Sequence, residues 1–189
     1  MAKIDLSTVE NYSSMTPEEK ARLEIDRKLK ESGWKIRSLY MGGGTPTTLS
    51  TPQMQRLMTA IERHFDLSEL IEYTVEGGRP DTLDLPKLRS IRAKGCERMS
   101  INPQTMNDKI LQTIGRRHTA QQTVEAFYQA KEAGFEGINM DLIAGLPGET
   151  RDSFRETLEK VLTLDPGNIT IHTLAMKKGA DLFFARLGL

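Results

Sequence analysis

Residues 36–46 read Ile-Arg-Ser-Leu-Tyr-Met-Gly-Gly-Gly-Thr-Pro, a strand-like run that ends in three consecutive glycines. Glycine has no Cβ and adopts positive φ readily, so the backbone N–H and C=O groups of this turn can line up along a ligand. The plainer alternative is an ordinary turn between a strand and a helix. Further strand-like segments occur at about 71–76, 97–101, 137–143 and 168–174. The sequence therefore predicts five strands, with a glycine turn after the first.

Helical patterns precede all five strands. Thr16-Pro17 followed by Glu19 is typical of a capped helix start, and Pro52 opens a second helix after Ser50 and Thr51. We expect helices at about 16–33, 51–65, 86–94, 107–114, 120–133 and 150–163. Strict alternation of helices and strands predicts a parallel sheet, because parallel neighbours need crossover connections.

Polar residues stand at the C-terminal ends of four predicted strands: Glu76, Asn102, Gln104, Asp141, His172 and Thr173. Barrels build their sites from several strand ends, whereas an open doubly wound sheet places its ligand at one switch point. We therefore favour an α/β fold, a partial TIM-like (β/α) barrel with parallel strands and about five βα units. Residues 1–15 are expected to be a flexible lead-in to one domain over 16–189.

The charge balance argues against a polyanionic partner. Lys and Arg number 26, as do Asp and Glu, so no net field favours nucleic acid or an acidic membrane surface. No apolar segment approaches membrane-spanning length and the N-terminus has no signal-peptide core, which predicts a cytoplasmic protein. The single cysteine, Cys96, leaves too few thiolates for a disulfide, a zinc site or an iron–sulfur cluster built by this chain alone.

Two acids are the first candidates for a binding site. Glu76 ends a strand before Gly77-Gly78, where it can accept from an ammonium group or a pair of hydroxyls. Asp141 interrupts an apolar strand and needs a partner, which can be Arg116, Arg117 or a ligand. Imidazole titrates near neutrality, but nothing pairs a histidine with a nucleophile, so no catalytic residue is assigned.

Six segments, taken in order, resemble the radical S-adenosylmethionine enzymes of the oxygen-independent coproporphyrinogen III oxidase type, including their HemZ-like branch. They are residues 42–47, 74–76, 98–104, 115–119, 139–148 and 172–174. The resemblance implies an S-adenosylmethionine site. The methionine amino group would be bound by the glycine turn, Gly42, Gly43, Gly44 and Thr45, with Glu76 beside it. The nucleoside and the carboxylate would be bound by Gln104, Arg116 and Asp141. Adenine would be contacted by Leu174. A carboxylate suits ribose hydroxyls and a guanidinium suits a carboxylate.

The family uses a [4Fe–4S] cluster to make a 5′-deoxyadenosyl radical, and the coproporphyrinogen enzymes decarboxylate propionates in haem biosynthesis. The family's Cys-x3-Cys-x2-Cys loop has no counterpart in this sequence, so no metal ligand is assigned and no radical chemistry is expected of the chain alone. We favour a fragment lacking the first barrel strand over a natural form that lost its cluster. The strand at 36–41 would then be an exposed edge, which predicts self-association.

The sequence leaves two other functions open. One is haem binding or haem delivery, with His64, His118 or His172 as candidate axial ligands. The other is a nucleotide-binding domain without activity. Arg79 and Arg117 can meet the propionates of a porphyrinogen substrate or can be ordinary surface charges.

Overall fold

The computed structural model describes residues 12–14, 16–17, 20–21, 23–24, 27–28, 32–33 and 35–175. Within the expected lead-in at 1–15, the structure describes the 3-10 turn η2 at Tyr12–Ser14. Within the expected helix at 16–33, the described residues 17, 20–21, 23–24 and 27–28 are helical. Residues 176–189, the end of the expected domain, also lie outside them.

Five strands form one sheet, in which spatial order follows chain order and each neighbouring pair is parallel. The strands are β1 (Ser38–Met41), β2 (Glu72–Gly78), β3 (Arg98–Gln104), β4 (Gly137–Ala144) and β5 (Asn168–Thr173). A doubly wound sheet would reverse its order at a switch point, and this sheet does not. The expected partial barrel is therefore confirmed: the sheet is singly wound and open, with β1 and β5 at its edges.

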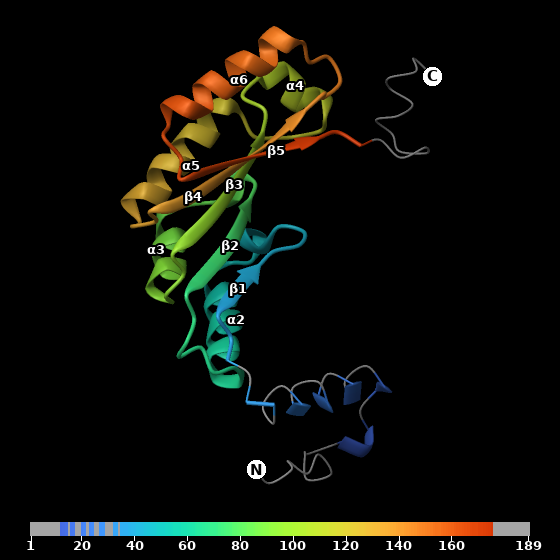
Figure 1. Ribbon diagram of the computed structural model, residues 1–189, viewed down its shortest axis with the longest axis vertical. Coiled ribbons are helices and arrows are strands. Elements are labelled where there is room, and N and C mark those ends of the chain that lie inside the picture. Colours follow the sequence, from blue (N-terminus) through green and yellow to red (C-terminus); the bar gives the residue numbers. More distant parts are fainter. Residues whose placement is uncertain are drawn as a thin grey trace.

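Helices and 3-10 turns connect the strands. They are η3 (Pro46–Thr48), α2 (Thr51–His64), η4 (Pro80–Thr82), α3 (Leu85–Ala93), α4 (Asp108–Thr113), α5 (Ala120–Glu132) and α6 (Arg151–Thr163). Ser50 forms a capping box with Gln53 at the start of α2, and Thr119 forms one with Gln122 at α5. Figure 1 shows α2, α3, α5 and α6 along one face of the curved sheet. No helix among the described residues is long and apolar enough to cross a bilayer.

The side chains of the sheet alternate between an apolar and a polar face. Val75, Met99, Ile138 and Met140 are fully buried in the core against the helices. The residues between them in the strands are polar, because successive side chains of a strand point to opposite faces. Residues from all five strands line a hollow on this polar face: Tyr40, Glu72, Thr74, Arg98, Ser100, Asn139, Asp141, Asn168, Thr170 and His172 among them. We call it the polar hollow.

The edge strand β1 is short. Among the described strands it pairs with β2 alone, through four residue pairs from Ser38 opposite Glu72 to Met41 opposite Val75. Self-association through this edge stays a prediction. Met54 and Met58 of α2 are buried in the core.

Candidate functional site

The glycine turn after β1 lies beside the carboxylate of Glu76. Gly43 and Gly44 have φ of 83° and 64°, and the Gly43 N–H donates to Glu76 Oε2 at 3.1 Å. A Cβ on Gly42 would overlap the Tyr40 ring and lie 2.7 Å from Glu76 Oε2. The turn therefore needs glycine for both its conformation and its close approach to the acid.

A chain of hydrogen bonds links Glu76 to Asp141, two strands away. Asn102 Nδ2 donates to Glu76 Oε1 at 3.2 Å, and Ser100 Oγ donates to Asn102 Oδ1 at 2.8 Å. Asn139 Nδ2 then donates to Ser100 Oγ at 3.2 Å and to Asp141 Oδ1 at 2.6 Å. We call these five side chains, with the Gly43 N–H, the amide relay. It fixes both acids on the polar face of the sheet.

Asn139 is the centre of the relay. Its Oδ1 accepts from Asn168 Nδ2 at 2.6 Å and from Thr170 Oγ1 at 3.0 Å, both on β5. The expected partner of Asp141 was Arg116, Arg117 or a ligand, and within the described residues the Asn139 amide takes that place. A neutral amide does not offset the charge of a carboxylate, so the Asp141 side chain can still bind a ligand.

The polar hollow has a volume of about 320 Å³ and holds Tyr40, Asp141 and His172 in its lining. The pKa of Tyr40 is raised by partial burial and then by the negative charges of Glu76 and Asp141. One phenol therefore senses both acids, which places them around the same space.

Gln104 and Arg116 lie on the rim at the carboxyl ends of the strands. Gln104 is buried, with a φ of 68° where the register of β3 on β4 shifts. The pKa of Arg116 is lowered by burial and by the positive charge of Arg79, while Asp81 opposes this. Arg79 Nε lies 3.9 Å from Asp81 Oδ1. Two guanidinium groups and one carboxylate therefore make this part of the rim cationic.

Leu174 follows β5 and lies apart from the polar hollow. Its N–H donates to Ala144 O at 3.0 Å, and it lines a second hollow, of about 540 Å³, with the turn at 145–149. The structure thus brings Gly42–Thr45, Glu76 and Asp141 together. Gln104, Arg116 and Leu174 flank them on the same edge of the sheet.

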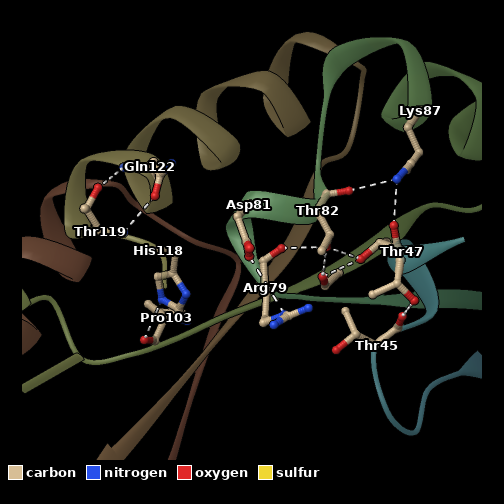
Figure 2. Close-up of polar contacts among 12 residues, drawn as sticks. Thr45, Thr47, Arg79, Asp81, Thr82, Lys87, Pro103, His118, Thr119 and Gln122 are labelled. Atoms are coloured by element: carbon tan, nitrogen blue, oxygen red, sulfur yellow. Dashed lines mark hydrogen bonds and ion pairs between the residues drawn. The ribbon is translucent and has the colours of Figure 1, made fainter. Parts of the chain in front are cut away.

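The three candidate haem ligands differ in their surroundings. His64 lies on the exposed surface of α2, with Nδ1 2.7 Å from Ala60 O. His118 is 2% exposed, with Nε2 3.3 Å from Pro103 O (Figure 2). His172 is exposed and lines the polar hollow, so it alone of the three has access to a ligand there.

The described residues do not fit an iron–sulfur cluster, but they do fit S-adenosylmethionine. Cys96 is fully buried, burial raises the pKa of its thiol to about 12, and its Sγ lies 3.2 Å from Arg98 O. No three His, Cys, Asp or Glu side chains in the described ranges gather as metal ligands. The bare backbone at Gly42 and the acids Glu76 and Asp141 match the ammonium and diol groups of S-adenosylmethionine.

The burial of His118 predicts a pH-dependent stability. Its pKa is lowered from 6.5, chiefly by burial, and its Nδ1 has no hydrogen-bond partner among the residues that the structure describes. The unfolded chain therefore takes up the proton first as the pH falls below 6.5, and stability is lost down to the lower folded pKa. Urea unfolding at about pH 7.5 and about pH 5.5 should show a smaller loss of stability in His118→Gln than in wild type. His64→Gln is the control and should lose as much stability between the two pH values as the wild type does. If His118→Gln also lost as much stability as the wild type, His118 would not be the source of the pH dependence.

A singly wound parallel sheet with ligand-binding groups at its strand ends defines a barrel-type α/β protein built around a small-molecule site. The family model described as Radical SAM superfamily matches residues 8–161. The chain therefore belongs to the radical SAM superfamily, within the group of the coproporphyrinogen III oxidases and their relatives.

The similar proteins agree with this assignment. The oxygen-independent coproporphyrinogen-III oxidase-like protein HemZ of Bacillus subtilis is 40% identical over 160 residues, which cover 84% of this chain and 32% of that protein. The heme chaperone HemW of Lactococcus lactis is 38% identical over 76% of this chain and 38% of its own length. Coproporphyrinogen III oxidase HemN from Escherichia coli has a TM-score of 0.73 at 28% identity, covering 92% of this chain and 41% of that one. The chain thus spans roughly a third to two fifths of these relatives.

Ser100 and Asn139 belong to the site but were not predicted from the sequence. Both alternate with buried apolar residues, as in Met99-Ser100-Ile101 and Ile138-Asn139-Met140. In a parallel sheet covered by helices on both faces, such strands would be apolar throughout. The alternation was therefore the available signal for a polar face.

Proposed function

We propose that the polar hollow and its rim bind S-adenosylmethionine. The observation that supports this most is the pairing of the Gly43 N–H with Glu76 and the relay from Glu76 to Asp141. In this proposal Glu76 and the glycine turn receive the ammonium group, Asp141 receives the ribose hydroxyls, and Arg116 receives the carboxylate. Gln104 and the Leu174 backbone contact the nucleoside.

We further propose that this site serves an oxygen-independent coproporphyrinogen III oxidase-like protein, with a porphyrinogen as substrate. Two similar proteins support this choice, because one is named an oxygen-independent coproporphyrinogen III oxidase and the other is named as like that enzyme. When bound in enzymes of this family, S-adenosylmethionine supplies a 5′-deoxyadenosyl radical. The sequence holds one cysteine, and the part of the chain that the structure describes holds no group of ligands that fits the cluster. We therefore assign this chain's own residues to binding and orientation and derive no redox step from them.

Isothermal titration of the 189-residue chain with S-adenosylmethionine tests the proposed site. Asp141→Ala and Gly43→Val should each weaken binding by about tenfold or more, because one loses a charged acceptor and the other strains a turn with φ of 83°. Asp152→Ala, which removes an exposed carboxylate from α6, is the control for the loss of a negative charge. Gly95→Val is the control for the backbone, since Gly95 has φ of 82° and equally open surroundings at the end of α3.

Both controls should bind as the wild type does. Equal losses in Gly43→Val and Gly95→Val would point to folding instead of the site. No binding by the wild-type chain would contradict the proposal for this chain.

A second candidate function is haem binding, and the HemW similarity together with the place of His172 supports it. Addition of hemin should then give a Soret band that His172→Ala removes and His64→Ala keeps. A spectrum that is identical in wild type and His172→Ala would count against haem ligation at this position.

A further inference from the structure

Lys87 is a buried lysine whose ammonium group has, among the described residues, only backbone carbonyl partners. It is 9% exposed, and its Nζ donates to Thr47 O at 2.6 Å and to Thr82 O at 3.0 Å. None of the ion pairs among the described residues involves it. Burying a charge without a counterion is unfavourable, so its surroundings must hold it firmly through these two hydrogen bonds.

The two carbonyls belong to the turns that follow neighbouring strands. Thr47 lies in η3, directly after the glycine turn 42–45, and Thr82 lies in η4, which begins two residues after Gly78. Figure 2 shows the Lys87 side chain reaching from its helix to both turns. One ammonium group therefore ties the turn after β1 to the turn after β2.

Two threonine hydroxyls complete the connection. Thr47, which is fully buried, donates from Oγ1 to Gly77 O at 2.7 Å, and its Oγ1 lies 2.6 Å from Thr82 Oγ1. Thr82 Oγ1 in turn donates to Arg79 O at 2.7 Å. Lys87 and Thr47, which are buried, and Thr82, which is partly buried, thus form one cluster of polar groups, which we call the turn clamp.

The turn clamp lies next to the contact that defines the proposed binding site. Gly77 follows Glu76 directly, and Thr47 lies four residues after Gly43. A Cβ on Gly78 would lie 2.8 Å from Thr45 Cγ2, so the two turns are also in close contact between the clamp and the site. A shift at Thr47 relative to Gly77 must therefore move the Gly43 N–H relative to the Glu76 carboxylate.

We propose that Lys87 is a positioning residue for S-adenosylmethionine: through Thr47 and Thr82 it sets the distance between the glycine turn and Glu76. The identity of the ligand in this inference rests on the proposed function. The clamping of the glycine turn does not, because it is inferred from the hydrogen bonds of Lys87, Thr47 and Thr82. Lys87 acts on the end of the site assigned to the methionine moiety. The relay through Asn102, Ser100 and Asn139 holds the other end without it.

The first test is amide hydrogen exchange of the ligand-free chain. Lys87→Met keeps most of the side-chain length and removes the ammonium group, and Thr47→Val removes the hydroxyl at nearly constant volume. In both variants the amides of residues 42–49 should exchange roughly tenfold faster, with β3 and β4 unchanged. Lys94→Met, at the end of the same helix, loses only the exposed ion pair with Glu62 and should match the wild type. Thr47→Ser should restore slow exchange.

The second test compares two ligands by titration. Lys87→Met should bind S-adenosylmethionine about tenfold more weakly, yet bind methylthioadenosine, which lacks the amino-acid group, as the wild type does. Equal losses for both ligands would show general destabilisation and overturn the positioning role. Unchanged exchange at 42–49 in Lys87→Met and Thr47→Val would overturn the clamp itself. If the wild type binds neither ligand, the proposed function and the positioning role both fail, and the exchange data still decide whether the clamp holds the turn.

Discussion

Gly77→Ala should lower the free energy of unfolding by roughly 2 kcal/mol or more, because the new methyl group has no room. An added Cβ would lie 2.9 Å from the backbone oxygen of Ser100, 3.1 Å from Leu83 Cδ1 and 3.2 Å from Met99 Sδ. The nearest of these atoms belongs to the backbone of β3 and cannot move without disturbing the sheet. Urea unfolding followed by circular dichroism measures the loss.

Gly167→Ala is the matched control for that measurement. Gly167, like Gly77, does not have a positive φ. A Cβ at Gly167 would lie 3.6 Å from its nearest atoms, which is an ordinary van der Waals contact. Its stability should stay within about 0.5 kcal/mol of wild type. If the two variants unfolded at the same urea concentration, the close approach of β2 to β3 at Gly77 would not exist in solution.

Gly42→Ala should weaken S-adenosylmethionine binding by roughly tenfold to 100-fold while changing folding stability far less. The new methyl group would overlap the Tyr40 ring and approach Glu76 Oε2 to 2.7 Å. Both are movable ends of side chains, so the strain is relieved when the ring and the carboxylate shift. The shift breaks the Gly43 N–H to Glu76 hydrogen bond on which the proposed site depends.

The double variant Tyr40→Ala with Gly42→Ala separates the two contacts. It removes the overlap with the ring and leaves the approach to the carboxylate, so binding should stay weak. Recovery of wild-type affinity in the double variant would assign the effect to Tyr40 and contradict the role given to Glu76. Titration calorimetry gives the affinities, and urea unfolding of both variants provides the stability control.

The sequence predicted the fold from local signals that the structure kept. Pro52 after Ser50 and Thr51 predicted a helix start, and Ser50 caps α2 in the structure. Glycines such as Gly95 and Gly134 mark helix ends, and both have positive φ. Alternation of helices and strands then required a parallel sheet. The choice of a barrel-type order depended on several strand ends carrying polar residues, among them Glu76 and Asp141, and the observed strand order agrees with it.

The partners of the candidate residues could not be predicted in the same way. Asp141 was expected to meet Arg116, Arg117 or a ligand, yet Asn139, two residues earlier in the same strand, donates a hydrogen bond to it. Lys87 looked like any charged residue near a helix start, because its burial depends on two turns that lie 40 and 5 residues away in sequence. Such contacts between side chains and distant turns depend on the register of neighbouring strands, and the register is established only when the sheet assembles.

The position of β1 has a thermodynamic consequence for any ligand of this site. β1 is an edge strand held by one neighbour, while Asp141 lies in β4, nearer the other edge of the sheet. A molecule that contacts both the turn after β1 and Asp141 would act as a non-covalent cross-link across the sheet. Ligand binding and the folding of the edge strand would then be linked equilibria. A higher ligand occupancy would therefore stabilise β1, the strand that the sheet holds through one neighbour.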